Sequence, residues 1–279
     1  EWWKQYHDQV LDELVRRALT SNPDIRTAAL RFYSARVQTQ VTASSATPEI
    51  DATGSVTRVQ TSKNSPSTLA LRQVLPESDQ LLSLMTKPYN WYQTGLDFSW
   101  ELDLWGHVRR AIEASNADLT AQKALLGLAR LSIIGDVVSN YNNLRAVQQQ
   151  MRLAEQDVST MASRLELISA RNQNGALNYT DVDRQQTELA GTRATLVDLR
   201  QQEGVAMNRI VLLTGDHPGA LNQLLVAPEQ IQTALMLPAL SLGVPSEVAL
   251  NRPDIQAAEA QLHAATARIG VARAELYPS

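Results

Sequence analysis

The sequence predicts a mainly α-helical fold that carries a single β-hairpin. No proline occurs between Pro88 and Pro218, a span far longer than two ordinary helices need. Near the start of that span, the segment Gly95–Gly106 alternates apolar and polar residues with a period of two, which is typical of a strand. From Leu144 onward the apolar residues instead follow a strict heptad, which is typical of a coiled coil.

Composition and charge exclude several classes of protein. The formal net charge is −4 and there are no runs of basic residues, so the sequence gives no support for nucleic-acid binding. The absence of cysteine excludes disulfides, a thiol nucleophile and thiolate metal ligands. No run of about 18 apolar residues is present, so no transmembrane helix is expected. The opening residues Glu1–Lys4 do not resemble a signal peptide and suggest a trimmed or mature start.

Residues 1–47 are predicted to form two helices. Apolar residues recur at helical spacing from Val10 to Leu19. A second helix is expected to begin at Pro23, because proline has no N–H group and the first helical position leaves that group unpaired anyway. Asn22 can cap this helix, which is expected to run to about Ala46.

Residues 48–105 are predicted to form a β-hairpin. The first strand, 48–62, alternates weakly, and residues 63–88 contain three prolines without a consistent period, so a long loop is expected there. The second strand, 89–105, has an apolar parity that includes Tyr92, Leu96, Phe98, Trp100 and Leu102, and a polar parity that includes Asp97, Ser99, Glu101 and Asp103. The alternation alone does not decide whether the apolar face meets a protein core or lipid.

Residues 106–213 are predicted to form a long antiparallel helical hairpin. One seam consists of Leu144, Met151, Val158 and Leu165 together with Val147, Ala154, Met161 and Ile168. A break at Asn172–Gly175 separates it from a second seam, Val182, Leu189, Leu196 and Ile210. An ordinary amphipathic helix is the alternative, although it usually shows a wider apolar stripe. At roughly 1.5 Å per residue, a helix from Gly106 to Arg171 would be about 100 Å long.

Residues 214–250 are rich in glycine and proline and are predicted to be a connector, followed by a helix in 251–279. A shift of 230 positions aligns 22–48 with 252–278 without a gap, and both copies end in proline. We interpret this match as an internal duplication. Residues 251–279 would then be the first helix of a second repeat, ending where that repeat should enter its strands.

No catalytic or metal-binding pattern is present. The four histidines lie in unrelated segments without metal-ligand spacing. No glycine-rich phosphate loop or nucleophile elbow occurs, and acids such as Glu101 and Asp103 at alternate strand positions usually form a solvated face. The sequence therefore predicts neither an enzyme nor a cofactor site.

The turn between the two long helices is a candidate functional region. Thr180 could cap the second helix, Asp181 would suit its first turn, and Asp183 could complete a capping box. These structural roles would account for the residues without any further function, and both kinds of role can coexist.

Three stretches resemble the TolC-type outer-membrane efflux proteins, and in particular the lipoprotein branch that serves tripartite RND multidrug pumps. "SWELDLWGHVRRAIEAS" (99–115) looks like the strand-to-helix signature of this family. "RNQNGALNYTDVDRQQTELA" (171–190) is similar to its hairpin tip. The stretch 238–279, "PALSLGVPSEVALNRPDIQAAEAQLHAATARIGVARAELYPS", resembles its most specific signature.

The resemblance implies a homotrimer in which each subunit adds strands to a shared barrel in the bacterial outer membrane and helices to a periplasmic barrel. The 279 residues would then be the N-terminal part of a subunit. The apolar strand parity would face outer-membrane lipid and the polar parity would line the water-filled duct. A lipid anchor is possible, but the residue that would carry it is not in this sequence.

The resemblance also assigns roles to the tip. Gly175, Ala176 and Leu177 resemble the motif that contacts the periplasmic adaptor protein, and the stretch Tyr179–Val182 resembles the constriction, with Thr180, Asp181 and Arg184 as expected gate residues. The expected function is a passive exit duct that opens when an adaptor and an inner-membrane RND-type pump dock at the tip. The alternative is a soluble periplasmic coiled-coil adaptor or scaffold, which would need a β-rich module around its hairpin. The exported substrates and the identity of the pump do not follow from the sequence.

Overall fold

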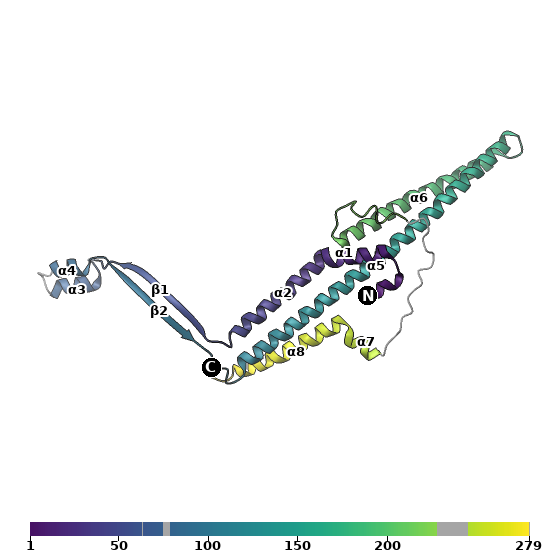
Figure 1. Cartoon of the computed structure of the whole chain (residues 1–279). Helices are drawn as coiled ribbons and strands as arrows, with labels where there is room; N and C mark the ends of the chain where they lie inside the picture. Colours follow the sequence, from purple (N-terminus) through teal and green to yellow (C-terminus); the bar gives the residue numbers. More distant parts are fainter. Residues whose placement is uncertain (63, 75–78, 228–244, 279) are drawn as a thin grey trace. The chain divides into compact units, whose positions relative to one another are not determined.

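The computed structural model describes residues 1–62, 64–74, 79–227 and 245–278. It confirms the predicted mainly helical fold with one β-hairpin (Figure 1). In chain order the elements are the 3-10 helix η1 (Trp2–Tyr6), α1 (Gln9–Ser21), α2 (Pro23–Ser44), β1 (Glu49–Val59), α3 (Pro66–Val74), α4 (Asp79–Met85), β2 (Tyr89–Ser99), α5 (His107–Gln173), α6 (Tyr179–Thr214), α7 (Pro245–Asn251) and α8 (Pro253–Ala274).

The chain forms two compact units. Unit 1 comprises residues 1–37 and 115–265, and unit 2 comprises residues 38–114 and 266–279. Within the described residues, no helix combines the length and the apolar character needed to cross a bilayer.

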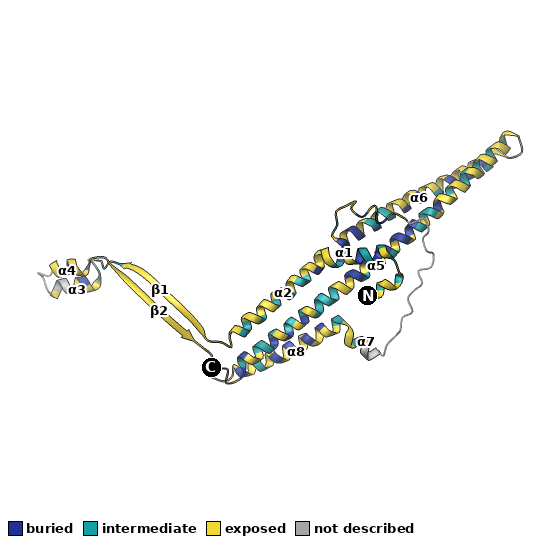
Figure 2. Cartoon of the chain, in the orientation of Figure 1, coloured by how far each residue is buried: buried dark blue, intermediate teal, exposed yellow. Residues whose placement is uncertain are grey.

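Unit 1 contains the main hydrophobic core. Buried side chains from α1, α5, α6 and the segment that follows α6 pack together there, and several of them, including Leu14, Leu144 and Ile210, are fully buried (Figure 2). The cluster consists of Leu11, Leu14, Val15, Ala18, Ile25, Ile133, Ile134, Val137, Val138, Tyr141, Leu144, Ala206, Ile210, Val211, Leu221 and Leu225. This core therefore holds the N-terminal helices and the beginning of the connector against the base of the long hairpin.

The predicted start of the second helix is confirmed. The Asn22 side chain accepts hydrogen bonds from the backbone N–H groups of Asp24 and Ile25, at 2.8 and 3.1 Å. The same side chain donates to the Leu213 carbonyl at 2.8 Å. Asn22 thus caps α2 and ties it to the end of α6, where Gly215 ends the helix with φ +70°.

The predicted coiled-coil seam is confirmed between α5 and α6. Val147, Ala154, Leu196 and Leu199 form a separate buried cluster, and Met151 packs against it. The seam positions of α5 from Val158 to Ile168 are half-buried, so the α5 side of the seam becomes more exposed toward the turn, while Val182 and Leu189 on α6 stay buried.

In unit 2, β1 and β2 pair antiparallel along their whole length, from Glu49 opposite Ser99 to Val59 opposite Tyr89. Both strands are shorter than predicted. The expected continuous loop 63–88 is also incorrect, because α3 and α4 occupy most of it; the described residues exclude 63 and 75–78. Local capping explains α3, since the Ser65 hydroxyl accepts from the Thr68 N–H group and Pro66 occupies the first helical position.

The internal repeat is visible in the helix pair α2 and α8. Both helices have 22 residues, both begin with proline, and the shift of 230 positions superposes their boundaries. Their final turns also match: the N–H groups of Ala46 and Thr47 bond to the carbonyls of Ala43 and Ser44, as those of Leu276 and Tyr277 bond to Arg273 and Ala274. The predicted connector, 214–250, lies partly outside the described residues, which omit 228–244.

Candidate functional site

The turn that joins α5 to α6 is a compact, hydrogen-bonded structure. Gly175 adopts φ +76°, a left-handed conformation that glycine accepts without strain. The N–H group of Gly175 bonds to the Asn172 carbonyl and that of Ala176 to the Arg171 carbonyl, both at 2.9 Å. This pair of bonds ends α5 as a Schellman motif. The Asn172 side chain then donates to the Leu177 carbonyl at 2.8 Å and closes the turn.

The expected capping role of Thr180 is wrong. The residue that precedes α6 is Asn178, whose side chain makes no capping hydrogen bond, and Thr180 lies inside the helix with an exposed side chain. The helix begins earlier than expected because the Schellman turn brings the chain back within a few residues of Gly175. Asp181 does lie in the first turn of α6, where the helix dipole favours a carboxylate.

The expected gate and adaptor residues are accessible. Gly175 and Ala176 are exposed and Leu177 is half-buried, while Asp181 is half-buried and Arg184 is exposed. Among the described residues, neither Asp181 nor Arg184 forms an ion pair within the chain. Both charges are therefore available to groups outside it.

A buried polar residue, which the sequence analysis missed, lies in the seam next to this turn. Gln185 is 3% exposed, and its side-chain Nε2 atom is buried without a hydrogen-bond partner among the described residues. A buried donor left unpaired costs roughly 1–3 kcal/mol. The sequence already indicated that Gln185 would be buried, because it follows the seam residue Val182 by three positions and so occupies the other core position of the heptad.

The alternating faces of the β-hairpin are confirmed within the strands. Tyr92, Leu96 and Phe98 lie opposite Val56, Ala52 and Ile50, and together they form one largely apolar face. Asp97 and Ser99 lie on the other face, opposite Asp51 and Glu49. Two features break the alternation: Arg58 belongs to the apolar parity, and Tyr89 and Trp91 belong to the polar one. Both faces of this two-stranded sheet are exposed in the chain.

The expected positions 100–105 of the second strand lie outside it, because β2 ends at Ser99. They include four residues that were assigned to a strand face: Trp100, Glu101, Leu102 and Asp103. The pairing stops where Ser99 meets Glu49, since the preceding Pro48 has no N–H group to extend the ladder. The following residues bond elsewhere. The Trp100 indole donates to the Ala46 carbonyl at 3.3 Å, and the Trp105 indole donates to the Pro278 carbonyl at 2.8 Å and stacks on Tyr277.

Asp103 starts α5 instead of facing solvent from a strand. Its carboxylate accepts from the N–H groups of Val108 and Arg109, at 3.1 and 2.9 Å, and from the Arg109 guanidinium at 3.2 Å. Burial works to raise the pKa of the Asp103 carboxyl, but these three donors outweigh it and hold that pKa below its usual value. Asp103 therefore supplies acceptors to N–H groups that have no partner within the helix.

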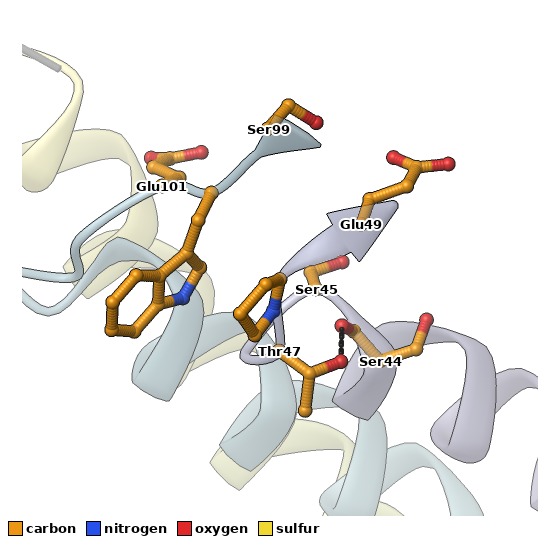
Figure 3. A pocket seen from close by; sticks show the side chains of 8 residues that line it. Ser44, Ser45, Thr47, Glu49, Ser99 and Glu101 are labelled. Atoms are coloured by element: carbon orange, nitrogen blue, oxygen red, sulfur yellow. Dashed lines mark hydrogen bonds between the residues drawn. The ribbon is translucent and has the colours of Figure 1, made fainter. Parts of the chain in front are cut away.

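An open pocket lies beside the end of α2, the start of β1 and the end of β2. Figure 3 shows the side chains that line it, with Glu49, Ser99 and Glu101 beside the polar turn at Ser44–Thr47. The Thr47 hydroxyl donates to the Ser44 carbonyl at 2.7 Å, so part of the polar lining serves the turn itself. Within the described ranges, no group of three or more histidine and acidic side chains is placed to hold a metal ion.

A buried polar network fixes the N-terminus and the connector to α5 in unit 1. The Tyr141 hydroxyl donates to the Asp8 carboxylate, which caps α1, and burial followed by this hydrogen bond raises the pKa of Tyr141 to about 12. The Arg145 guanidinium lies over the Tyr141 ring and donates to the carbonyl of Val226 at 3.0 Å and to the Gln148 side chain at 2.8 Å. Gln148 in turn donates to Glu203 and to the Leu225 carbonyl, both at 2.9 Å.

Comparison with known proteins identifies similar chains along nearly the whole length. The pyoverdine export outer membrane protein OpmQ of Pseudomonas aeruginosa is 29% identical over 278 residues, which cover 100% of this chain and 56% of OpmQ. The structure of the outer-membrane channel OprN is similar with a TM-score of 0.81 and 31% identity, covering 99% of this chain and 58% of that one. The outer membrane channel CmeC of Campylobacter jejuni gives a TM-score of 0.80 at 25% identity, covering 98% of this chain and 55% of that one.

The chain spans about half the length of the curated relatives it matches. OpmQ is described as an export outer membrane protein and OprN and CmeC as outer-membrane channels, and none of the three is described as a soluble adaptor, the alternative that the sequence left open. Residues 14–216 match the family described as outer membrane efflux protein. Because this match covers more than half of the chain and runs from within α1 to the end of α6, the chain belongs to the outer membrane efflux protein family.

Proposed function

We propose that this chain is part of a subunit of a trimeric exit duct in the bacterial outer membrane. The duct carries solutes passively out of the periplasm as the outer component of a tripartite efflux pump. The β-hairpin lies in the membrane and the α5–α6 hairpin extends into the periplasm. An adaptor and an inner-membrane RND-type pump dock at the turn between α5 and α6 and open it there.

The observation that carries the proposal is the exposed apolar face of the β-hairpin. Leu96 and Phe98 on β2 are 78% and 65% exposed, and Ile50 and Val56 on β1 are 66% and 70% exposed. Contiguous apolar surface of this kind is unusual on a water-facing strand pair but is expected where a sheet faces lipid. The opposite face, with Asp51, Asp97 and Ser99, suits a water-filled duct.

The two repeated helices support assembly with further long helices. Five alanines of α8 are buried: Ala257, Ala260, Ala264, Ala267 and Ala274. The positions of α2 that correspond to them through the repeat are all exposed: Thr27, Leu30, Ser34, Val37 and Ser44. On this bare face Leu30 and Val37 are 61% and 57% exposed. The helix α2 therefore leaves exposed the face that α8 buries, which suits a closed ring of helices contributed by several subunits.

The proposed mechanism needs no chemistry from the chain. The OpmQ, OprN and CmeC proteins are described as export proteins or channels, and we propose no catalytic role and no cofactor for this chain. The energy for transport comes from the inner-membrane pump. The tip supplies the contact surface through Gly175, Ala176 and Leu177 and the gate through Thr180, Asp181 and Arg184.

The membrane placement is tested by inserting arginine at two neighbouring sites of opposite parity on β2. Leu96→Arg places a charge on the proposed lipid face and is expected to cost about 2–4 kcal/mol near the membrane midplane. Gln93→Arg is the matched control on the proposed duct face and is expected to be mild. The amount of heat-stable trimer in outer-membrane fractions is measured for both variants of the intact protein, alongside efflux in cells that lack their own channel. Equal tolerance of arginine at the two sites would contradict the membrane placement.

A further inference from the structure

We propose that Gln185 makes the part of the helical hairpin nearest the turn a built-in weak point that allows the tip to open. We define the tip segment as residues 158–192, which include the last turns of α5, the turn itself and the first turns of α6. This inference rests on the proposed function, because it assigns a source of mobility to the gate of the same duct.

The core of α6 changes character along its length. One of its two heptad core positions is occupied, from the turn toward the base, by Gln185, Thr192, Leu199, Ala206 and Leu213. Only the two residues inside the tip segment are polar. Apolar side chains at this position hold coiled coils together, and a polar side chain there lowers stability. At this core position the polar residues thus lie only at the end of the hairpin next to the turn, whereas the buried polar residues toward the base, Arg145 and Gln148, are hydrogen-bonded.

Gln185 differs from the other buried glutamine of the same hairpin. Gln148 and Gln185 are each 3% exposed. The Gln148 amide accepts from Arg145 and donates to Glu203 and to the Leu225 carbonyl. The Nε2 atom of Gln185 has no partner among the described residues. The hairpin therefore satisfies a buried amide at its base and leaves one unsatisfied next to its tip.

Two neighbouring features weaken the same segment. The N-terminus of α6 has no side-chain capping bond, because the Asn178 side chain makes none. The α5 residues that form the other side of the seam here, from Val158 to Ile168, are only half-buried. On the α6 side of this seam Val182 and Leu189 are 5% and 4% exposed, so separation of the two helices at this point uncovers these two side chains and also lets the Gln185 amide bond to water. Opening thus recovers a hydrogen bond that the closed hairpin lacks.

The test replaces the amide with an apolar side chain of the same length. Gln185→Met keeps the shape of the side chain and removes the unpaired donor, and Gln186→Met makes the same change at an exposed neighbour and serves as the control. Hydrogen exchange of the tip segment is measured in the intact protein in detergent. We expect exchange in the tip segment to slow by roughly tenfold in Gln185→Met and to remain unchanged in Gln186→Met. Leu189→Gln, which adds a second buried amide one turn away, is expected to speed exchange.

Transport is then measured in cells whose own channel has been deleted. Gln185→Met is expected to lower efflux at unchanged amounts of trimer, because the closed tip has become more stable, while Gln186→Met transports like the wild type. Unchanged exchange in Gln185→Met would overturn the proposal, and slower exchange with unchanged efflux would also overturn it. Failure of the wild-type protein to restore efflux would instead count against the proposed function, since the exchange measurements do not depend on transport.

Discussion

Alanine at Gly215 is expected to destabilise unit 1 more than alanine at Gly175, although the two glycines have nearly the same backbone conformation. Their φ angles are +70° and +76°. A residue with a Cβ atom pays roughly 1–2 kcal/mol in this left-handed region, so both variants carry that cost. At Gly215 the new Cβ would also lie 2.7 Å from the Ser21 carbonyl oxygen, whereas at Gly175 nothing lies within 4 Å.

The contact at Gly215 involves backbone on both sides, so it cannot be relieved by rotating a side chain. Forcing an extra carbon into a packed site typically costs about 1–3 kcal/mol. The two contributions together predict a loss of roughly 2–5 kcal/mol for Gly215→Ala and only roughly 1–2 kcal/mol for Gly175→Ala. The additional loss of unfolding free energy in Gly215→Ala, relative to Gly175→Ala, measures how tightly the α1–α2 junction is held against the end of α6.

The assay is denaturant unfolding in detergent followed by circular dichroism, with the midpoints compared at a constant slope. Gly191→Ala serves as a control inside α6, where nothing lies within 4 Å of the added Cβ. The unfolding free energy of this control variant is expected to rise by about 0.5–1 kcal/mol, because alanine is a better helix former than glycine. A Gly215→Ala variant no less stable than Gly175→Ala would refute the reasoning, since it would show that the junction yields freely.

Three further predictions concern single side chains. Tyr141→Phe removes the hydroxyl that donates to the Asp8 carboxylate and is expected to cost about 1.5–3 kcal/mol in unfolding free energy; a loss below about 0.5 kcal/mol would mean that water replaces the bond. Because the pKa of Asp103 is lowered in the folded protein, its contribution to stability is present above the ordinary aspartate pKa and is lost as the pH falls through the lowered value. Asp103→Asn is therefore expected to make the melting temperature fall less steeply at acidic pH. Parallel profiles of melting temperature against pH for the two proteins would contradict this. Asp181→Ala is expected to raise the resting conductance of the channel. The melting temperature of the trimer should stay nearly unchanged, because the lost helix-dipole interaction amounts to only about 0.3–1 kcal/mol. A variant that melts at a lower temperature without leaking would limit Asp181 to a structural role.

The long elements of this fold follow from the sequence because their signals repeat many times. The heptad from Leu144 to Ile168 contains eight apolar positions in a row, so single exceptions cannot obscure it. The start of α2 was equally clear, since Asn22 and Pro23 act locally through the cap and the first helical position. The repeat was visible because the two copies align without a gap.

The ends of the shorter elements did not follow, because they depend on contacts that no local pattern reveals. The alternation from Leu96 continues to Leu104, yet the strand stops at Ser99 since Asp103 binds the first turn of α5 and Pro48 ends the partner strand. The helix α6 starts before Thr180 because the turn at Gly175 closes tightly. The unpaired amide of Gln185 could have been located by extending the heptad, but only the structure shows that it lacks a partner.

The hydrogen bond between Asn22 and Leu213 joins residues 191 positions apart and has a consequence for how the chain folds. Near the turn, Asn172 and Leu177 meet across 5 positions, and Gln148 meets Glu203 across 55. Because closing a longer loop costs more entropy, the hairpin is expected to zip from its turn toward its base before α1 and α2 dock. Translation proceeds from the N-terminus, so Leu11 and Leu14 emerge from the ribosome long before α6 has been made and can cover them. The helices α1 and α2 are thus made before α6 but are buried only after the hairpin has formed, and their apolar faces need protection throughout the interval.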